Sequence, residues 1–144
     1  MIPQHVRQDI EAAFGTVPSF LERVPAPLIE SEWETFKRFQ LQDTALPMRT
    51  KELLGLAVAS ALQCPYCTYF HEAAARLHGA SDEEITEAVF MAKHTAGWST
   101  FLRGSNQPFE EFRSEVDGMV EYLRTHAGPA EAGPGGARQA GRSR

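Results

Sequence analysis

The only two cysteines of the chain, Cys64 and Cys67, lie three residues apart, and His71 follows four residues after the second. Pro65 stands between them, and proline is favoured in the first turn of a helix, where its missing N–H costs nothing. In a helix that begins there, positions 64, 67 and 71 fall on one stripe. Unpaired N–H groups at a helix start favour the thiolate, which is the reactive form of cysteine. The segment therefore predicts a nucleophile, a base and a second thiol that can close a disulfide.

The spacing alone leaves open which thiol attacks. His71 follows Cys67 by one turn and can accept its proton, whereas the helix dipole favours Cys64, which we expect nearer to solvent. Two other interpretations use the same residues. The cysteines can be small buried apolar side chains, or they can bind zinc together with His71. A closed zinc site needs four ligands, and the nearest further candidate, His78, is poorly aligned, so we expect no metal.

Glu52 is a candidate partner for His71, because it precedes a nearly all-apolar helical stretch. If residues 48–62 and 65–79 form a helical hairpin, Glu52 lies ~16–18 Å from the turn and His71 ~9–10 Å, at ~1.5 Å per residue. A crossing angle, side-chain reach or a second subunit would have to make up the difference. A glutamate that only complements the helix dipole explains the position equally well.

Four further side chains are candidates for the wall of a pocket. Tyr66 and Tyr69 lie within the cysteine helix, although aromatic side chains on helices more often belong to the core. His94 and Trp98 lie one turn apart on a later helix. No glycine-rich phosphate loop and no serine-centred elbow occurs in the sequence.

The elements that must position these residues are helices, because β-branched residues are scattered and no stretch alternates cleanly. The apolar periodicity predicts a compact all-α bundle of about six helices, over residues 3–14, 27–41, 48–62, 65–79, 81–104 and from 108 onward. Residues 16–25 contain two prolines and are expected to be mostly loop. Ser81 and Glu84 form a capping box at the start of one helix. The apolar run 53–62 predicts a helix that is buried on nearly all sides.

The composition divides the 144 residues into a globular part, 1–126, and a C-terminal tail, 127–144. The tail holds five of the eleven glycines and no aromatic residue, so we expect it to be disordered. It carries three arginines and one glutamate, which leaves 11 basic and 18 acidic residues in the globular part. Such an acidic domain argues against a nucleic-acid partner. With no apolar run of membrane length and no signal peptide, we expect no membrane contact and a reducing, cytoplasmic location.

One pattern combines the residues described above: Glu52, eleven further residues, Cys64-Pro-Tyr-Cys67, three residues and His71. This pattern resembles that of the AhpD-like alkylhydroperoxidase family of the carboxymuconolactone decarboxylase superfamily. The resemblance extends through residues 78–85 and is strongest over 48–104. It implies an all-α fold, assembly as trimers or hexamers, and reduction of peroxides without haem, metal or another bound cofactor. It also implies that Cys67 attacks the peroxide and becomes a sulfenic acid, that Cys64 resolves it, and that His71 and Glu52 relay protons.

The chain departs from the best-known branch of that family, which has a histidine where Tyr66 stands and is built as a duplicated unit. That branch takes electrons from a lipoyl-bearing partner. The resemblance therefore implies a cysteine-dependent peroxidase that reduces hydrogen peroxide or small organic hydroperoxides with an external thiol reductant, of the lipoyl type or another. A thiol–disulfide oxidoreductase and a decarboxylase-like lyase acting on a lactone acid are the alternatives, and lyase chemistry does not need two thiols.

Self-association is also expected from the residues, because Trp33, Phe36 and Phe39 would leave an aromatic patch on the exterior of a lone chain. Exposed apolar patches of this kind usually mark interfaces.

Overall fold

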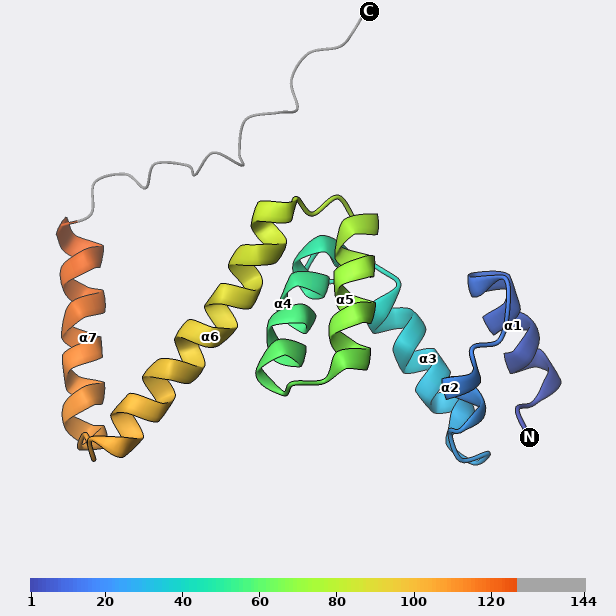
Figure 1. The fold of residues 1–144 in the computed structure, drawn as a ribbon, viewed down its shortest axis with the longest axis horizontal. Coiled ribbons are helices and arrows are strands. Elements are labelled where there is room, and N and C mark those ends of the chain that lie inside the picture. Colours follow the sequence, from blue (N-terminus) through green and yellow to red (C-terminus); the bar gives the residue numbers. More distant parts are fainter. Residues whose placement is uncertain (127–144) are drawn as a thin grey trace, which may run out of the picture. The chain divides into compact units, whose positions relative to one another are not determined.

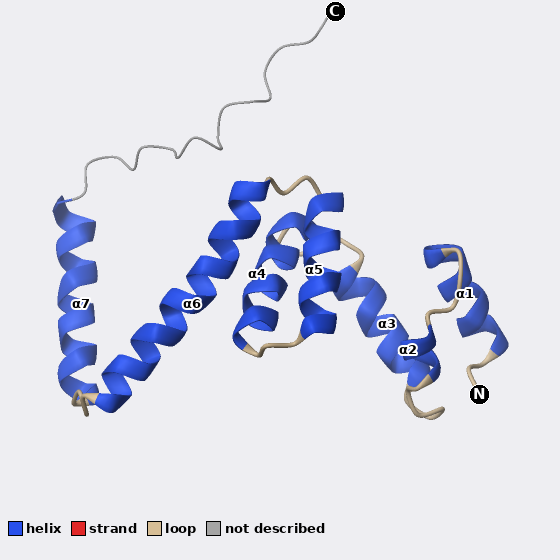
Figure 2. Cartoon of the chain, in the orientation of Figure 1, coloured by secondary structure: helices blue, strands red, loops and turns tan. Residues whose placement is uncertain are grey.

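The computed structural model describes residues 1–126, and within them it contains helices and no strand (Figures 1 and 2). The helices are α1 (Gln4–Phe14), α2 (Ser19–Glu22), α3 (Ile29–Gln40), α4 (Met48–Ala61), α5 (Pro65–Leu77), α6 (Asp82–Gly104) and α7 (Phe109–His126). The predicted all-α fold is confirmed. The predicted tail, 127–144, lies outside the described residues.

The prediction that residues 16–25 are mostly loop is confirmed, and the single helical turn α2 lies within them. Pro18 lies just before it with an extended backbone (φ −62°, ψ 137°), a position that proline tolerates because no helical N–H is lost. The single turn that follows brings Leu21 into the core, where the side chain is 2% exposed. Burial of this leucine outweighs the weak helical tendency of so short a segment.

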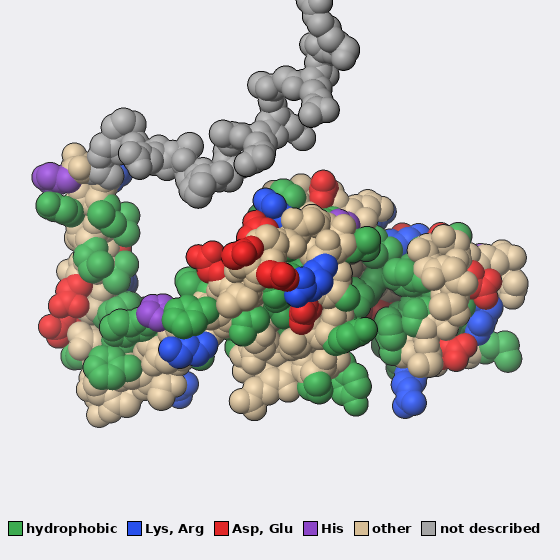
Figure 3. Space-filling view, turned by 45° about the horizontal axis from the view of Figure 1, so that its top comes forward, with side chains coloured by type: hydrophobic (Ala, Val, Ile, Leu, Met, Phe, Trp, Pro, Cys, Tyr) green, Lys and Arg blue, Asp and Glu red, His purple; other side chains and the backbone are tan. Residues whose placement is uncertain are grey.

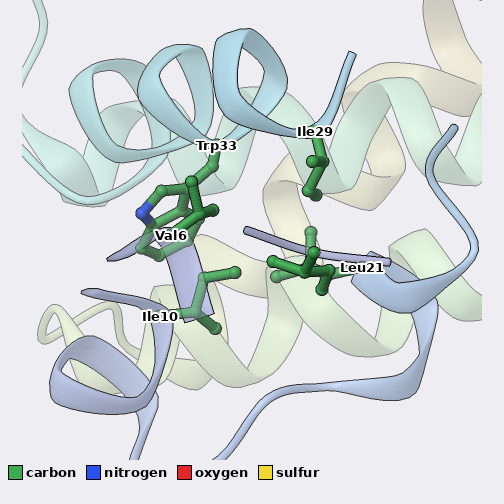
Figure 4. Close-up of a cluster of buried hydrophobic side chains, with 6 residues drawn as sticks. Val6, Ile10, Leu21, Ile29 and Trp33 are labelled. Atoms are coloured by element: carbon green, nitrogen blue, oxygen red, sulfur yellow. The ribbon is translucent and has the colours of Figure 1, made fainter. Parts of the chain in front are cut away.

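The first hydrophobic core joins α1, α2 and α3 (Figure 4). Val6 and Ile10, one turn apart on α1, share a face and pack with Leu21, Ile29 and Trp33. The indole N–H of Trp33 donates to Asp9 Oδ2 at 2.8 Å, so its polar atom is satisfied. This core holds α3, which supplies one wall of the candidate site.

The prediction that Trp33, Phe36 and Phe39 form an aromatic patch on the exterior is wrong for Trp33 and Phe36. Trp33 is 1% exposed, and Phe36 packs partly buried against the core. Only Phe39 remains exposed. The spacing of these residues identified an apolar face of α3, but α1 and α2 cover most of it.

A second core lies between α4, α5 and α6, where Leu56, Ala75 and Ile85 are buried. Figure 1 shows α4 and α5 side by side, and the contacts between these two helices are extensive. The prediction that residues 53–62 are buried on nearly all sides is wrong. Leu54, Val58 and Leu62 lie along one stripe of α4 and are more than half exposed, because α5 and α6 cover only the opposite face in a single chain.

A buried lysine ties α3 to α4. Lys51 Nζ donates to the carbonyl oxygens of Phe39 and Gln42, each at 2.9 Å. Carbonyls at a helix C-terminus lack intrahelical partners and attract positive charge. The rings of Phe36 and Phe70, 6.1 Å apart, add a contact between α3 and α5. Together these contacts place α3 beside the cysteine helix.

The contacts divide the chain into two compact units, one from Met1 to Trp98 and one from Ser99 onward, with α6 running across the boundary. Every candidate site residue lies in the first unit. In the second unit α7 has no buried residue, and Figure 3 shows hydrophobic side chains at its surface. Among the described helices, none has the length and the apolar character that a membrane crossing requires.

Candidate active site

The cysteine helix begins from a tight turn that ends α4. Gln63 adopts a left-handed conformation (φ 56°) and its N–H donates to the carbonyl of Ser60, while the N–H of Cys64 donates to that of Ala59, both at 3.1 Å. These two bonds form a Schellman motif. Cys64 is thereby left at the N-cap of α5, with Pro65 in the first helical position. Both placements confirm the predicted helix start.

The two sulfur atoms lie 2.7 Å apart and both cysteines are free. Cys64 Sγ also accepts the backbone N–H of Cys67 at 3.3 Å. A disulfide bond of about 2.05 Å is therefore within reach of a small side-chain movement. The exposure differs from the expectation that Cys64 lies nearer to solvent. Cys64 is half-buried, whereas Cys67 is exposed, because the N-cap sulfur turns inward over the first turn of the helix.

The contact between the thiols makes them unequal acids. The hydrogen bond with the Cys67 side chain, followed by the one from the Cys67 backbone N–H, lowers the pKa of Cys64. The same side-chain contact is the largest cause that raises the pKa of Cys67. Cys64 is therefore the more acidic of the two thiols.

The structure brings Glu52 and His71 together within one chain. Nδ1 of His71 lies 2.7 Å from Oε2 of Glu52, and the carboxyl side chain is completely buried. With the carboxylate ionised, Nδ1 carries the proton and donates it, which leaves Nε2 free to accept one. Oε1 of Glu52 has no hydrogen-bond partner among the described residues. A second subunit is not needed for this contact, and the pairing with His71 goes beyond a helix-dipole role for Glu52.

A cleft of about 450 Å³ opens beside Cys67 and His71. Aromatic side chains from three helices form most of its wall, with a few polar groups from α3; the other lining residues are Phe20, Glu32, Thr35, Phe36, Phe39, Gln40, Tyr66 and Phe70. Cys64 is not part of this lining. A molecule in the cleft therefore meets the sulfur of Cys67 and the imidazole of His71 and does not meet Cys64.

The remaining predicted pocket residues divide between the cleft and the outside. Tyr66 lines the cleft, but Tyr69, which is 79% exposed, does not. On α6 the indole N–H of Trp98 donates to Nε2 of His94 at 3.1 Å, and neither side chain borders the cleft. His94 also stacks on Phe90.

The zinc interpretation finds no ligand set within residues 1–126. No group of three or more His, Cys, Asp or Glu side chains is placed there to hold a metal ion.

Several residues of the cleft were not expected from the sequence. Phe70 directly precedes His71, with the two rings 5.2 Å apart, and its position one turn after Cys67 is a signal that could have identified it. Phe20 carried no such signal, because only the short helix α2 brings it to the cleft. Glu32 and Gln40 also depend on the placement of α3.

Known proteins resemble this chain in sequence and in fold. Residues 27–107, more than half of the chain, match the model of the carboxymuconolactone decarboxylase family. A curated relative, an uncharacterized protein in the cox locus of Paracoccus denitrificans, is 39% identical over 64 residues, which are 44% of this chain and 58% of that protein. The chain thus spans little more than half the length of this relative.

A solved structure, the alkylhydroperoxidase AhpD core of Rhodospirillum rubrum, is similar over 75% of this chain and 82% of its own, with 28% identity and a TM-score of 0.65. The family model covers the cysteine pair, His71 and Glu52, and the structural match extends over most of the described helices. The chain therefore belongs to the carboxymuconolactone decarboxylase family and is an AhpD-like member of it.

Proposed function

We propose that this protein is a cysteine-dependent peroxidase that reduces hydroperoxides through a dithiol–disulfide cycle of Cys67 and Cys64. The observation that carries the proposal is the arrangement at the cleft. Cys67 and His71 border it, Glu52 holds the far side of the imidazole, and the sulfur of Cys64 lies 2.7 Å behind that of Cys67.

The cycle balances with these groups and one external reductant. His71 Nε2 takes the proton of Cys67, and the thiolate attacks the terminal oxygen of the hydroperoxide. The O–O bond breaks, Cys67 becomes a sulfenic acid, and the alkoxide leaves as an alcohol with the proton from His71. The Cys64 thiolate then attacks the Cys67 sulfur, the S–O bond breaks, and the departing hydroxide takes up the proton that Cys64 gave to solvent, so that water is released as the disulfide forms. A thiol reductant returns two electrons and two protons and restores both thiols.

The unequal acidities of the thiols suit this division of roles. The lowered pKa of Cys64 favours the thiolate form of the resolving sulfur, which is the form that attacks the sulfenic acid. The raised pKa of Cys67 means that its thiolate does not form readily by itself near neutral pH. A base beside Cys67 is therefore required, and His71 is the group that lies one turn away on the same helix.

The lining of the cleft favours hydroperoxides with an apolar organic group over hydrogen peroxide. Five aromatic side chains contribute to it, and burial of an apolar substituent against them stabilises the complex. No lysine or arginine belongs to the described lining. The lactone acid of a decarboxylase-like lyase would thus find no cationic partner, which counts against that alternative.

The reductant, in this proposal, is an external thiol of the lipoyl type or another, in a cytoplasm that keeps both cysteines reduced. Exposed apolar side chains on α6 and α7, among them Phe90, Phe101 and Leu123, support self-association as a trimer or hexamer.

The direct test is a thiol titration. One equivalent of cumene hydroperoxide added to the reduced protein without air should convert two free thiols to none and yield one equivalent of cumyl alcohol. Dihydrolipoamide should then sustain turnover. If both thiols persist after peroxide while the protein reduces insulin disulfides rapidly, the thiol–disulfide oxidoreductase alternative takes the place of the peroxidase.

The substitution Phe20→Ala tests the role of the cleft. This ring lines the cleft and is half-exposed, so its loss removes apolar contact with little effect on the core. We expect kcat/KM for cumene hydroperoxide to fall about 10-fold, because apolar contacts in a pocket discriminate at this scale, and the value for hydrogen peroxide to change little. Phe109→Ala, which removes an exposed ring outside the cleft, is the matched control. Equal losses for both peroxides in Phe20→Ala would show that the organic group does not bind there.

A further inference from the structure

Gly55 lies in the interior of α4, where glycine weakens a helix relative to alanine. The packing around Gly55 explains why a glycine stands there, and the side chain that packs against it belongs to α5. A Cβ atom on Gly55 would come 2.5 Å from Nδ1 and 2.7 Å from Nε2 of His71, and it would also overlap Cε1. The imidazole thus lies directly against the backbone of α4.

The register of the helical hairpin explains this close approach. Gly55 and His71 are each about six residues from the turn between α4 and α5, so they face each other across the hairpin. Glu52 lies one helical turn further from the hairpin turn than Gly55, and its carboxyl group is completely buried. The His71 ring can reach Oε2 of Glu52 only if it extends across the position that a side chain at residue 55 would occupy.

We propose that Gly55 is a positioning residue, whose missing side chain lets the His71 imidazole lie against α4 with Nδ1 on Glu52. The positioning is independent of the peroxidase chemistry, and only its consequence for Cys67 rests on the proposed function. In Gly55→Ala the ring must leave its place, because the three atoms nearest to the added Cβ all belong to the imidazole and lie 2.7 Å or less from it.

A double-mutant cycle separates this clash from ordinary helix propensity. In the wild-type background Gly55→Ala should lower the melting temperature. In the His71→Ala background the space is free, and the same substitution should raise the melting temperature by about 2–8 °C, because alanine is the better helix former. Gly97→Ala is the control, since a Cβ on this helical glycine of α6 meets no atom within 4 Å. It should raise the melting temperature in both backgrounds.

The position of the imidazole can be read by NMR in the same variants. The Nδ1–H proton of His71, hydrogen-bonded to the Glu52 carboxylate, should give a downfield resonance in the wild type and in Gly97→Ala. It should be lost in Gly55→Ala and should move upfield in Glu52→Gln, where a neutral amide oxygen accepts in place of the carboxylate. An equal change of melting temperature on Gly55→Ala in both backgrounds, or an unchanged His71 resonance in Gly55→Ala, would overturn the assignment. Neither readout uses a peroxide, so a failure of the proposed function leaves this test intact.

Discussion

Replacing Cys67 with serine is expected to abolish fast peroxide consumption, while replacing Cys64 with serine should allow one reaction and no more. Cys67 lines the cleft, so it is the sulfur that a bound hydroperoxide meets. In Cys64→Ser the sulfenic acid formed on Cys67 has no resolving thiol, and dimedone should trap it in stoichiometric amount. Stopped-flow peroxide consumption and mass spectrometry of the dimedone adduct measure both results.

The acidities of the two thiols favour the opposite assignment, in which Cys64 attacks the peroxide and Cys67 resolves the sulfenic acid. Cys64 is the thiol whose pKa is lowered, by its contact with the Cys67 side chain and then by the Cys67 N–H. If dimedone labels Cys64 in the Cys67→Ser protein at a rate comparable to that of Cys67 in Cys64→Ser, acidity decides the attacking thiol and the geometry of the cleft does not. If neither single variant reacts quickly with any hydroperoxide, the peroxidase proposal fails.

His71→Ala is expected to slow the reaction of Cys67 by about 10²–10⁴-fold at neutral pH, the usual cost of losing a general base. The loss should shrink as the pH rises. The contact with Cys64 raises the pKa of Cys67, so the Cys67 thiolate forms unaided only at alkaline pH, above that raised pKa. The pH–rate profile of His71→Ala should therefore move toward alkaline pH. An unchanged profile would remove His71 from the mechanism.

The variant Glu52→Gln separates the orienting role of Glu52 from that of the base itself. Glutamine keeps an oxygen that can accept from Nδ1 but removes the negative charge of the carboxylate, which makes this hydrogen bond weaker. We expect a smaller rate loss than in His71→Ala, in the same direction. Glu72→Gln is the matched control on the surface of α5, because Glu72 pairs with exposed Arg76 and does not line the cleft. A wild-type rate in Glu52→Gln would assign Glu52 a structural role only.

Local signals in the sequence predicted the start of two helices. Proline after a potential capping residue predicted the beginning of α5 at Pro65 with Cys64 as its N-cap, and the structure agrees. Ser81 and Glu84 predicted a capping box, and each bonds the backbone N–H of the other, at 3.2 and 2.9 Å. These features depend on residues within one turn of each other, so the chain around them determines them.

It was harder to predict which helix faces are buried and which other helices cover them. The apolar face of α3 was visible in the sequence, but its covering by α1 and α2, which buries Trp33, was not. The run 53–62 suggested burial all round, yet Val58 and its neighbours on that stripe are exposed. Periodicity shows which residues share a side of a helix, and it does not show which other element lies against that side.

The residue types and spacing of Cys64, Cys67 and His71 predicted the chemistry that we propose and placed it on the first two turns of one helix, because a helix converts sequence separation directly into direction. Tertiary structure decided the rest of the site. Glu52 meets His71 only through the register of α4 against α5 and the open space at Gly55, and the cleft exists only because Lys51 and the aromatic contacts hold α3 there. Distances between elements depend on how small and large side chains interlock across an interface, and no separation along a single helix encodes them.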